Sequence, residues 1–146
     1  MQGKKRQTYK FIFSGQTKKE VIFSKELLHL ADESDKEELE QIGFFEAREV
    51  DLYLQNASIY ILRIDGKYVG LGTLIYPYWR KDIPAQNFQD IGMHVAEEYR
   101  GKGFGRSIVQ HMVSICLENG KIPIAECLID NAASKATLES AGFIKH

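Results

Sequence analysis

Two apolar runs, each followed by a segment of helical character, fill most of the second half of the chain. The first run, Phe88–Val95, leads through a glycine-rich turn into an apolar-periodic helix over residues 107–117. The second run, residues 122–129, leads into a helix over residues 132–141. A helix that connects two strands of one sheet normally sets those strands parallel. The order therefore predicts an α/β protein with a mixed sheet, in which the two runs are parallel strands.

The turn between the first run and its helix carries Gly101, Gly103 and Gly105. These glycines can adopt positive φ and let a ligand approach the backbone closely. Arg100 and Arg106 add positive charge beside the first N–H groups of the helix, which have no partner within it. The turn is therefore predicted to hold a pyrophosphate group. Its spacing is neither that of a dinucleotide-binding turn nor that of a P-loop, and this disfavours an ATP-binding protein.

The other elements are predicted from alternation, turn residues and helix caps. Asn131 is expected to cap the last helix, which Gly142 ends. A strand pair is expected from Tyr9, Phe11 and Phe13 and, after Gly15, from residues 21–23. Two helices follow: the first is opened by a capping box at residues 34–37 and closed by Gly43, and the second covers about residues 45–55. After them come a hairpin of residues 58–64 and 67–76 around Asp65 and Gly66, a loop over residues 77–87 and, at the end, an extended segment over residues 143–146.

Composition excludes several classes of protein. The chain has 146 residues and a formal net charge of −1, which fits one domain and gives no basic surface for nucleic acid or an anionic membrane. No unbroken apolar stretch indicates a secretory signal or a membrane span. Cys116 and Cys127 lie in apolar runs and are expected to be reduced core residues of a cytoplasmic protein. The four histidines show no paired spacing, so no metal is expected.

Two sequence blocks resemble the GCN5-related N-acetyltransferase (GNAT) superfamily. The first is a hydrophobic strand that ends in Val95, four further residues and then Arg-Gly-x-Gly-x-Gly over residues 100–105. The second is a strand followed by Asn-x-x-Ser and a helix that ends in Gly-Phe, at Asn131, Ser134, Gly142 and Phe143. The resemblance implies an acyl-CoA N-acyltransferase-like fold, a central mixed sheet flanked by about four helices, as a single domain over residues 1–146. It covers residues 25–146.

The resemblance also implies acetyl-CoA as the co-substrate. The residues it assigns to acetyl-CoA are Met93, His94, Val95, Arg100, Gly101, Lys102, Gly103, Phe104, Gly105, Arg106, Asn131 and Ser134. The family normally continues through two closing strands, which are short or missing here. We therefore expect either that the N-terminal strand pair completes the sheet or that this chain is a piece of a longer protein.

Acetyl transfer to an amine requires a base, because an alkyl ammonium has a pKa near ~10.4 in water. Carboxylates near the expected cleft are Glu126, Asp90 and Glu49, of which Glu126 ranks first and Asp90 second. Many family members place an acidic tyrosine seven residues after the asparagine, where this chain has Leu138. Ser134, Tyr99 or water are the candidates for that role.

The leading hypothesis is an N-acetyltransferase whose acceptor is an amine of a small molecule or a peptide. The loop over residues 77–87 and the second helix are expected to shape the acceptor pocket. The alternative is a non-catalytic acyl-CoA-binding sensor or partner domain, which the missing tyrosine favours. An open sheet edge makes a homodimer plausible.

Overall fold

A computed structural model describes residues 7–17 and 19–146. In these residues seven strands form one mixed sheet in the order β2-β3-β4-β5-β6-β1-β7. The strands are β1 (Thr8–Phe13), β2 (Leu28–Leu30), β3 (Ile59–Ile64), β4 (Lys67–Ile75), β5 (Phe88–Val95), β6 (Ile122–Leu128) and β7 (Phe143–Lys145). The α-helices are α1 (Lys36–Ile42), α2 (Ala47–Gln55), α3 (Phe104–Glu118) and α4 (Ala132–Ser140). The mixed α/β class is confirmed.

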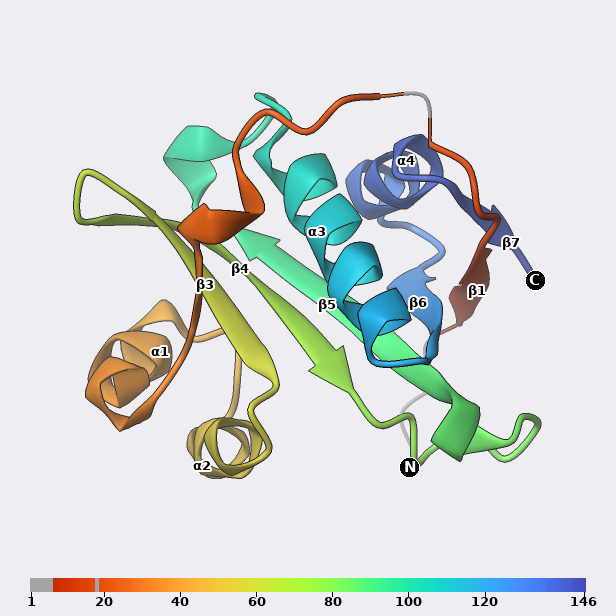
Figure 1. The fold of residues 1–146 in the computed structure, drawn as a ribbon, viewed down its shortest axis with the longest axis horizontal. Helices are drawn as coiled ribbons and strands as arrows, with labels where there is room; N and C mark the ends of the chain where they lie inside the picture. Colours follow the sequence, from red (N-terminus) through yellow and green to blue (C-terminus); the bar gives the residue numbers. More distant parts are fainter. Residues whose placement is uncertain (1–6, 18) are drawn as a thin grey trace, which may run out of the picture.

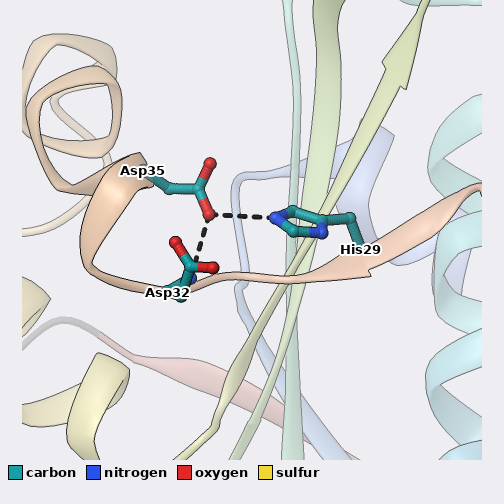
Figure 2. A group of neighbouring side chains, drawn as sticks. All are labelled: His29, Asp32 and Asp35. Atoms are coloured by element: carbon teal, nitrogen blue, oxygen red, sulfur yellow. Dashed lines mark hydrogen bonds and ion pairs between the residues drawn. The ribbon is translucent and has the colours of Figure 1, made fainter.

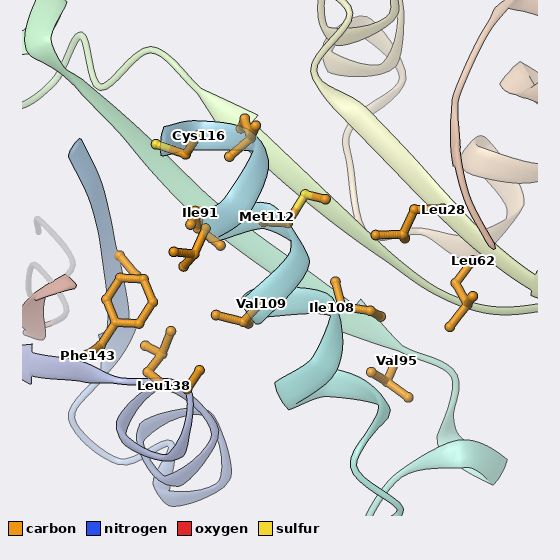
Figure 3. Packing of buried hydrophobic residues seen from close by; sticks show 14 of the residues in the cluster. Leu28, Leu62, Ile91, Val95, Ile108, Val109, Met112, Cys116, Leu138 and Phe143 are labelled. Atoms are coloured by element: carbon orange, nitrogen blue, oxygen red, sulfur yellow. The ribbon is translucent and has the colours of Figure 1, made fainter. Parts of the chain in front are cut away.

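The helices cover the two faces of the sheet in pairs, α3 with α4 and α1 with α2 (Figure 1). The main core lies under α3, where its apolar side chains meet those of the sheet and of α4 (Figure 3). α3 lies very close to β4: a Cβ added at Gly72 would stand only 2.6 Å from Cγ of Met112. The residues labelled in this core are Leu28, Leu62, Ile91, Val95, Ile108, Val109, Met112, Cys116, Leu138 and Phe143.

The predicted hairpin is confirmed as β3 and β4. Its two turn residues, Asp65 and Gly66, have φ of 53° and 77°. Positive φ at both central positions is the geometry that matches the twist of a two-residue hairpin.

The predicted parallel pair is also confirmed, but it is short. β5 and β6 are in register only from Phe88 with Ile122 to Asp90 with Ile124. Beyond that point β6 continues beside β1, and β5 runs on alone on this side (Figure 1). The sheet therefore splits between β5 and β6.

The expectation that the N-terminus completes the sheet is correct for β1. This strand lies antiparallel between β6 and β7, with Phe11 opposite both Ala125 and Lys145. The expected second strand at residues 21–23 is wrong. There the N–H of Ile22 donates to Ser107 Oγ at 2.9 Å, and His111 Nε2 bonds to the carbonyl of Phe23 at 2.8 Å. Side chains of α3 thus take the backbone groups that a strand would need.

The predicted helix starts need correction. The capping box lies at Asp32 and Asp35 rather than at residues 34–37, and it opens a short 3-10 turn that leads into α1. Gly43 closes α1 with φ of 75°, as expected. α2 begins at Ala47, not at residue 45, because Glu46 and Glu49 form a capping box there. No helix in the described part of the chain is long and apolar enough to span a membrane.

Candidate functional site

The split in the sheet leaves backbone groups of β5 without a strand partner. The N–H of Ala96 donates to the carbonyl of Val69 at 2.8 Å, which makes Val95 and Gly70 a non-hydrogen-bonded pair. Because such pairs alternate along an antiparallel ladder, Met93 is in the same position. Met93 and Val95 therefore direct their N–H and C=O groups toward the gap, where no described strand meets them. The Val95 carbonyl accepts from Arg100 Nε at 2.9 Å.

A cleft of about 620 Å³ lies at this gap. One wall is the end of β5, the floor is the glycine turn, and the other wall is one side of α4 along its length. The lining residues are Lys19, Met93, His94, Val95, Arg100, Gly101, Gly103, Gly105, Arg106, Asn131, Ala133, Ser134, Ala136, Thr137 and Ser140.

The glycine turn has the geometry of an anion cradle. Gly101 and Gly103 have φ of 77° and 92°, a region that side chains rarely adopt. The first bond of α3 runs from Ser107 N–H to the Gly103 carbonyl, so the N–H groups of residues 104–106 have no partner within the helix. A Cβ at Gly105 would stand 3.4 Å from Sδ of Met93, which keeps the floor close to β5. Exposed helix N–H groups and the positive helix end favour a bound anion.

The α4 wall carries small side chains. Asn131 caps α4 by accepting from the Ser134 N–H at 3.1 Å, as predicted. Ala133, Ser134, Ala136, Thr137 and Ser140 then face the cleft, and none of them is large enough to fill it. Leu138 lies instead in the core.

The structure brings together most of the residues expected to bind acetyl-CoA. All of them line the cleft except Lys102, whose side chain is exposed, and Phe104, which packs against Phe23 and Tyr99. Tyr99 therefore lies against the core, away from the cleft. Sequence reasoning missed five of the lining residues: Lys19, Ala133, Ala136, Thr137 and Ser140. Thr137 lies three residues after Ser134 and six after Asn131, so it is on the same side of α4 as Ser134. This spacing could have identified it from the sequence.

The expected catalytic residues fall into two groups. Ser134 lines the cleft, whereas Asp90 and Glu126 do not. Glu126 is fully engaged: Thr8 Oγ1 donates to it at 3.0 Å, and Trp79 Nε1 donates to it at 3.1 Å. Arg80 Nη1 lies 3.8 Å from the same carboxylate.

Asp90 stands beside this group on β5. Its Oδ1 is buried and has no hydrogen-bond partner among the described residues. Burial, together with the nearby Glu126 carboxylate, raises the pKa of Asp90 to about 8, although the Arg80 guanidinium acts in the opposite direction. Glu49, the third candidate, bonds to the backbone N–H of Glu46 and is used as a helix cap.

His94 lines the cleft, but its backbone does not face the gap in the sheet. Its backbone belongs to the pairing with Leu71 on β4. The ring bonds to the Tyr68 hydroxyl through Nδ1 at 2.8 Å, and it lies 5.3 Å from the exposed ring of Phe44 between centroids. Burial, and then the charge of Arg100, lower the pKa of His94, so the ring favours its neutral form.

A second cavity of about 410 Å³ lies near the start of β5, where Gln89, the neighbour of Asp90, forms part of its wall. It is lined by Leu52 and Tyr53 of α2 and by Tyr78 of the loop over residues 77–87. The loop and the second helix, which were expected to shape the acceptor pocket, therefore both line this cavity.

Three side chains outside the cleft have the donor types of a metal site. These are His29, Asp32 and Asp35, drawn in Figure 2. Asp35 already accepts from Arg63 Nη2 at 2.8 Å and from the N–H of Asp32 at 2.9 Å. Burial alone would raise the pKa of Asp35, but these bonds hold it below its usual value. The group therefore serves as a helix cap with its own cation in Arg63, and we assign it no metal.

The splayed sheet, the glycine cradle and the narrow cleft between β5 and α4 together define an acyl-CoA N-acyltransferase fold. The N–H groups of residues 104–106 have no partner within α3, and no described strand pairs with the backbone groups of Met93 or with the N–H of Val95. Residues 24–143 match the sequence profile of the acetyltransferase (GNAT) family. The chain belongs to this family.

Individual relatives agree with this membership. The chain is 33% identical over 57 residues to the uncharacterized N-acetyltransferase YdfB of Bacillus subtilis (strain 168), a match that covers 39% of this chain and 22% of that protein. A GNAT-family acetyltransferase from Colwellia psychrerythraea has a similar fold, with a TM-score of 0.78 at 18% identity over 97% of this chain and 53% of the other. YncA of Salmonella typhimurium, a putative acetyltransferase solved with its cofactor acetyl-CoA, has a TM-score of 0.69 at 18% identity over 80% and 78% of the two chains.

Proposed function

We propose that this protein transfers the acetyl group of acetyl-CoA to an amine of a small molecule or a peptide, and that residues 1–146 act as one catalytic domain. The observation that carries the proposal is the cleft, which joins a phosphate cradle to unpaired backbone groups of β5. Family membership supports catalysis over the alternative of a non-catalytic acyl-CoA-binding sensor.

In this proposal, the N–H groups of residues 104–106 and the charges of Arg100 and Arg106 bind the pyrophosphate. Met93 and Val95 hold the pantetheine arm through their backbone, and the small residues of α4 leave room for it. Bound acetyl-CoA supplies a thioester carbonyl for attack. The N–H of Met93 or Val95 would stabilise the negative charge that develops on its oxygen.

We propose Asp90 as the general base, ahead of Glu126. The reason is that Glu126 is occupied by Thr8 and Trp79, whereas Asp90 has an unpartnered oxygen and a raised pKa. A base with a pKa near the working pH is the effective one for taking a proton from an ammonium group. The acceptor would enter through the cavity at Tyr53 and Tyr78.

The proton for the departing thiolate has a candidate donor in Ser134. Its hydroxyl lies on the first turn of α4 and lines the cleft. Leu138 occupies the family's tyrosine position, and its hydrocarbon side chain cannot donate a proton. A thiol with a pKa of ~8.5 also leaves readily without protonation by the enzyme.

A turnover assay tests the proposal. We expect thiol release from acetyl-CoA in the presence of an amine panel, and we expect Asp90→Asn to reduce it by about 100-fold or more while coenzyme binding persists. Asp65→Asn, at an exposed position of the β3–β4 turn, is the matched control. Binding of acetyl-CoA without turnover on any amine would favour the sensor reading instead.

Three further expectations stay proposals: action in the cytoplasm, formation of a homodimer through a sheet edge, and independence from metal. Gel filtration with light scattering tests the second. Unchanged turnover after chelation tests the third.

A further inference from the structure

The position of β1 forces an unusual connection. β1 lies next to β7 at one edge of the sheet, whereas β2 forms the opposite edge. The chain between them passes over the N-terminal end of α3 (Figure 1). The described residues of this connection, 14–17 and 19–24, are called the strap here.

The strap is fixed to α3 by side chains of that helix. Gln110 Nε2 donates to the carbonyl of Lys19 at 2.6 Å, and Arg106 Nη2 donates to the carbonyl of Glu20 at 3.1 Å. Farther along, Phe23 is buried in the main core. The backbone from Lys19 to Phe23 is therefore held by contacts distant in sequence.

These contacts place Lys19 in the wall of the coenzyme cleft. The two arginines of the cleft are partly committed, because Arg100 Nε donates to Val95 and Arg106 donates to the strap itself. No acidic side chain in the described part of the chain forms an ion pair with Lys19. Lys19 is exposed, and within the described ranges its ammonium group has no acidic partner, so it is available to an anion in the cleft.

We propose that Lys19 binds a phosphate of the coenzyme, as a contact supplied by the strap and additional to the glycine cradle. This inference rests on the proposed function, because it needs the cleft to bind coenzyme A. Coenzyme A offers two sources of phosphate charge, the pyrophosphate and the 3′-phosphate. An ammonium group on a long flexible side chain suits either of them.

Calorimetric titration of the full chain with coenzyme A and with 3′-dephospho-coenzyme A tests the inference. We expect Lys19→Ala to weaken binding of coenzyme A by about 5- to 20-fold, with a smaller loss at high salt. Lys19→Arg should retain most of the affinity. Lys67→Ala, which removes the same charge at the β3–β4 turn, should leave it unchanged. Folding is preserved because the strap is anchored through the Lys19 carbonyl, and thermal melting verifies this.

The two ligands distinguish the sources. A loss with coenzyme A alone assigns Lys19 to the 3′-phosphate, and an equal loss with both ligands assigns it to the pyrophosphate. Equal affinities of Lys19→Ala and the unaltered chain for both ligands would overturn the inference and leave the proposed function standing. Absence of binding by the unaltered chain would instead overturn both.

Discussion

The pKa of the Asp90 carboxyl lies far above that of a free aspartate side chain. Its pKa is raised to about 8, mainly by burial and then by the Glu126 carboxylate. The pKa of the same carboxyl in the unfolded chain is ~3.9. At pH values between ~3.9 and about 8, the folded protein therefore holds a proton that the unfolded chain has released. Its contribution to stability is therefore complete below pH ~4 and is lost as the pH rises toward 8.

Replacement of Asp90 by Asn should remove this dependence. We expect the free energy of unfolding of the unaltered chain to fall between pH ~4 and ~8, and that of Asp90→Asn to fall much less. Urea unfolding at several pH values measures this, with Asp65→Asn as the control. Parallel curves for the unaltered chain and Asp90→Asn would mean that the carboxyl is already ionised in the fold.

The pH profile of turnover follows from the same carboxyl. If Asp90 is the base, kcat/KM should rise with pH, reach half of its plateau near pH 8 and level off above it, because only the ionised form accepts a proton. Rates measured with an acceptor whose own pKa lies well below 8 separate the two titrations. A profile flat across this range would remove Asp90 from the role.

The sequence was a better guide to the residues that line the cleft than to the ranking of the candidate bases. Three glycines between a strand and a helix indicate a tight turn, and this can be inferred from that one segment of sequence. The choice between Glu126 and Asp90 depended on Thr8 and Trp79, both remote in sequence, which satisfy Glu126 in the fold. Lys19 was missed for the same reason, since only the path of the strap places it at the cleft.

Among the elements, β1 has the largest structural consequence. It inserts between β6 and β7, and its Phe11 is only 1% exposed in the main core. We expect Phe11→Ala to destabilise the protein by about 3–5 kcal/mol through lost burial and a cavity. Ile144→Ala on β7, at a side chain 54% exposed, should change stability by no more than about 0.5 kcal/mol. Chemical denaturation compares the two, and equal effects would mean that β1 contributes little to the sheet.

Elements defined by neighbouring residues were predicted correctly: the Asp65-Gly66 hairpin, the cap at Asn131 and the parallel crossover. The strands that pair with β1 could not be predicted from the sequence, because local alternation does not specify which distant strand is the partner. At Phe23 the local pattern predicted the wrong structure. Its apolar neighbours favoured a strand, but contacts with His111 of α3 determine its conformation.

At the scale of the whole molecule, coenzyme binding should stabilise the fold. The cleft is built from β5, α3, α4 and the strap, so a ligand that bridges them binds the folded state alone. At a ligand concentration of 100 times Kd, the free energy of unfolding should rise by about 2.7 kcal/mol. A thermal melt with and without coenzyme A measures this, and an unchanged midpoint at saturation would contradict it.

The central claim is that the glycine turn of a GNAT-family fold binds the phosphates of acetyl-CoA, and a pair of substitutions at Gly103 tests it most directly. Gly103 has φ of 92° at the N-cap of α3, and a Cβ there would meet nothing closer than 3.5 Å. Asn and Asp both tolerate positive φ and both cap helices, so each variant should fold. Only Asp adds a negative charge to the cradle.

Titration of both variants with acetyl-CoA is therefore the measurement that matters most. We predict that Gly103→Asn binds within about fivefold of the unaltered chain and that Gly103→Asp loses at least about tenfold more, equivalent to 1.4 kcal/mol. Equal affinities of the folded Asn and Asp variants, or no binding by the unaltered chain, would contradict a phosphate site at this turn.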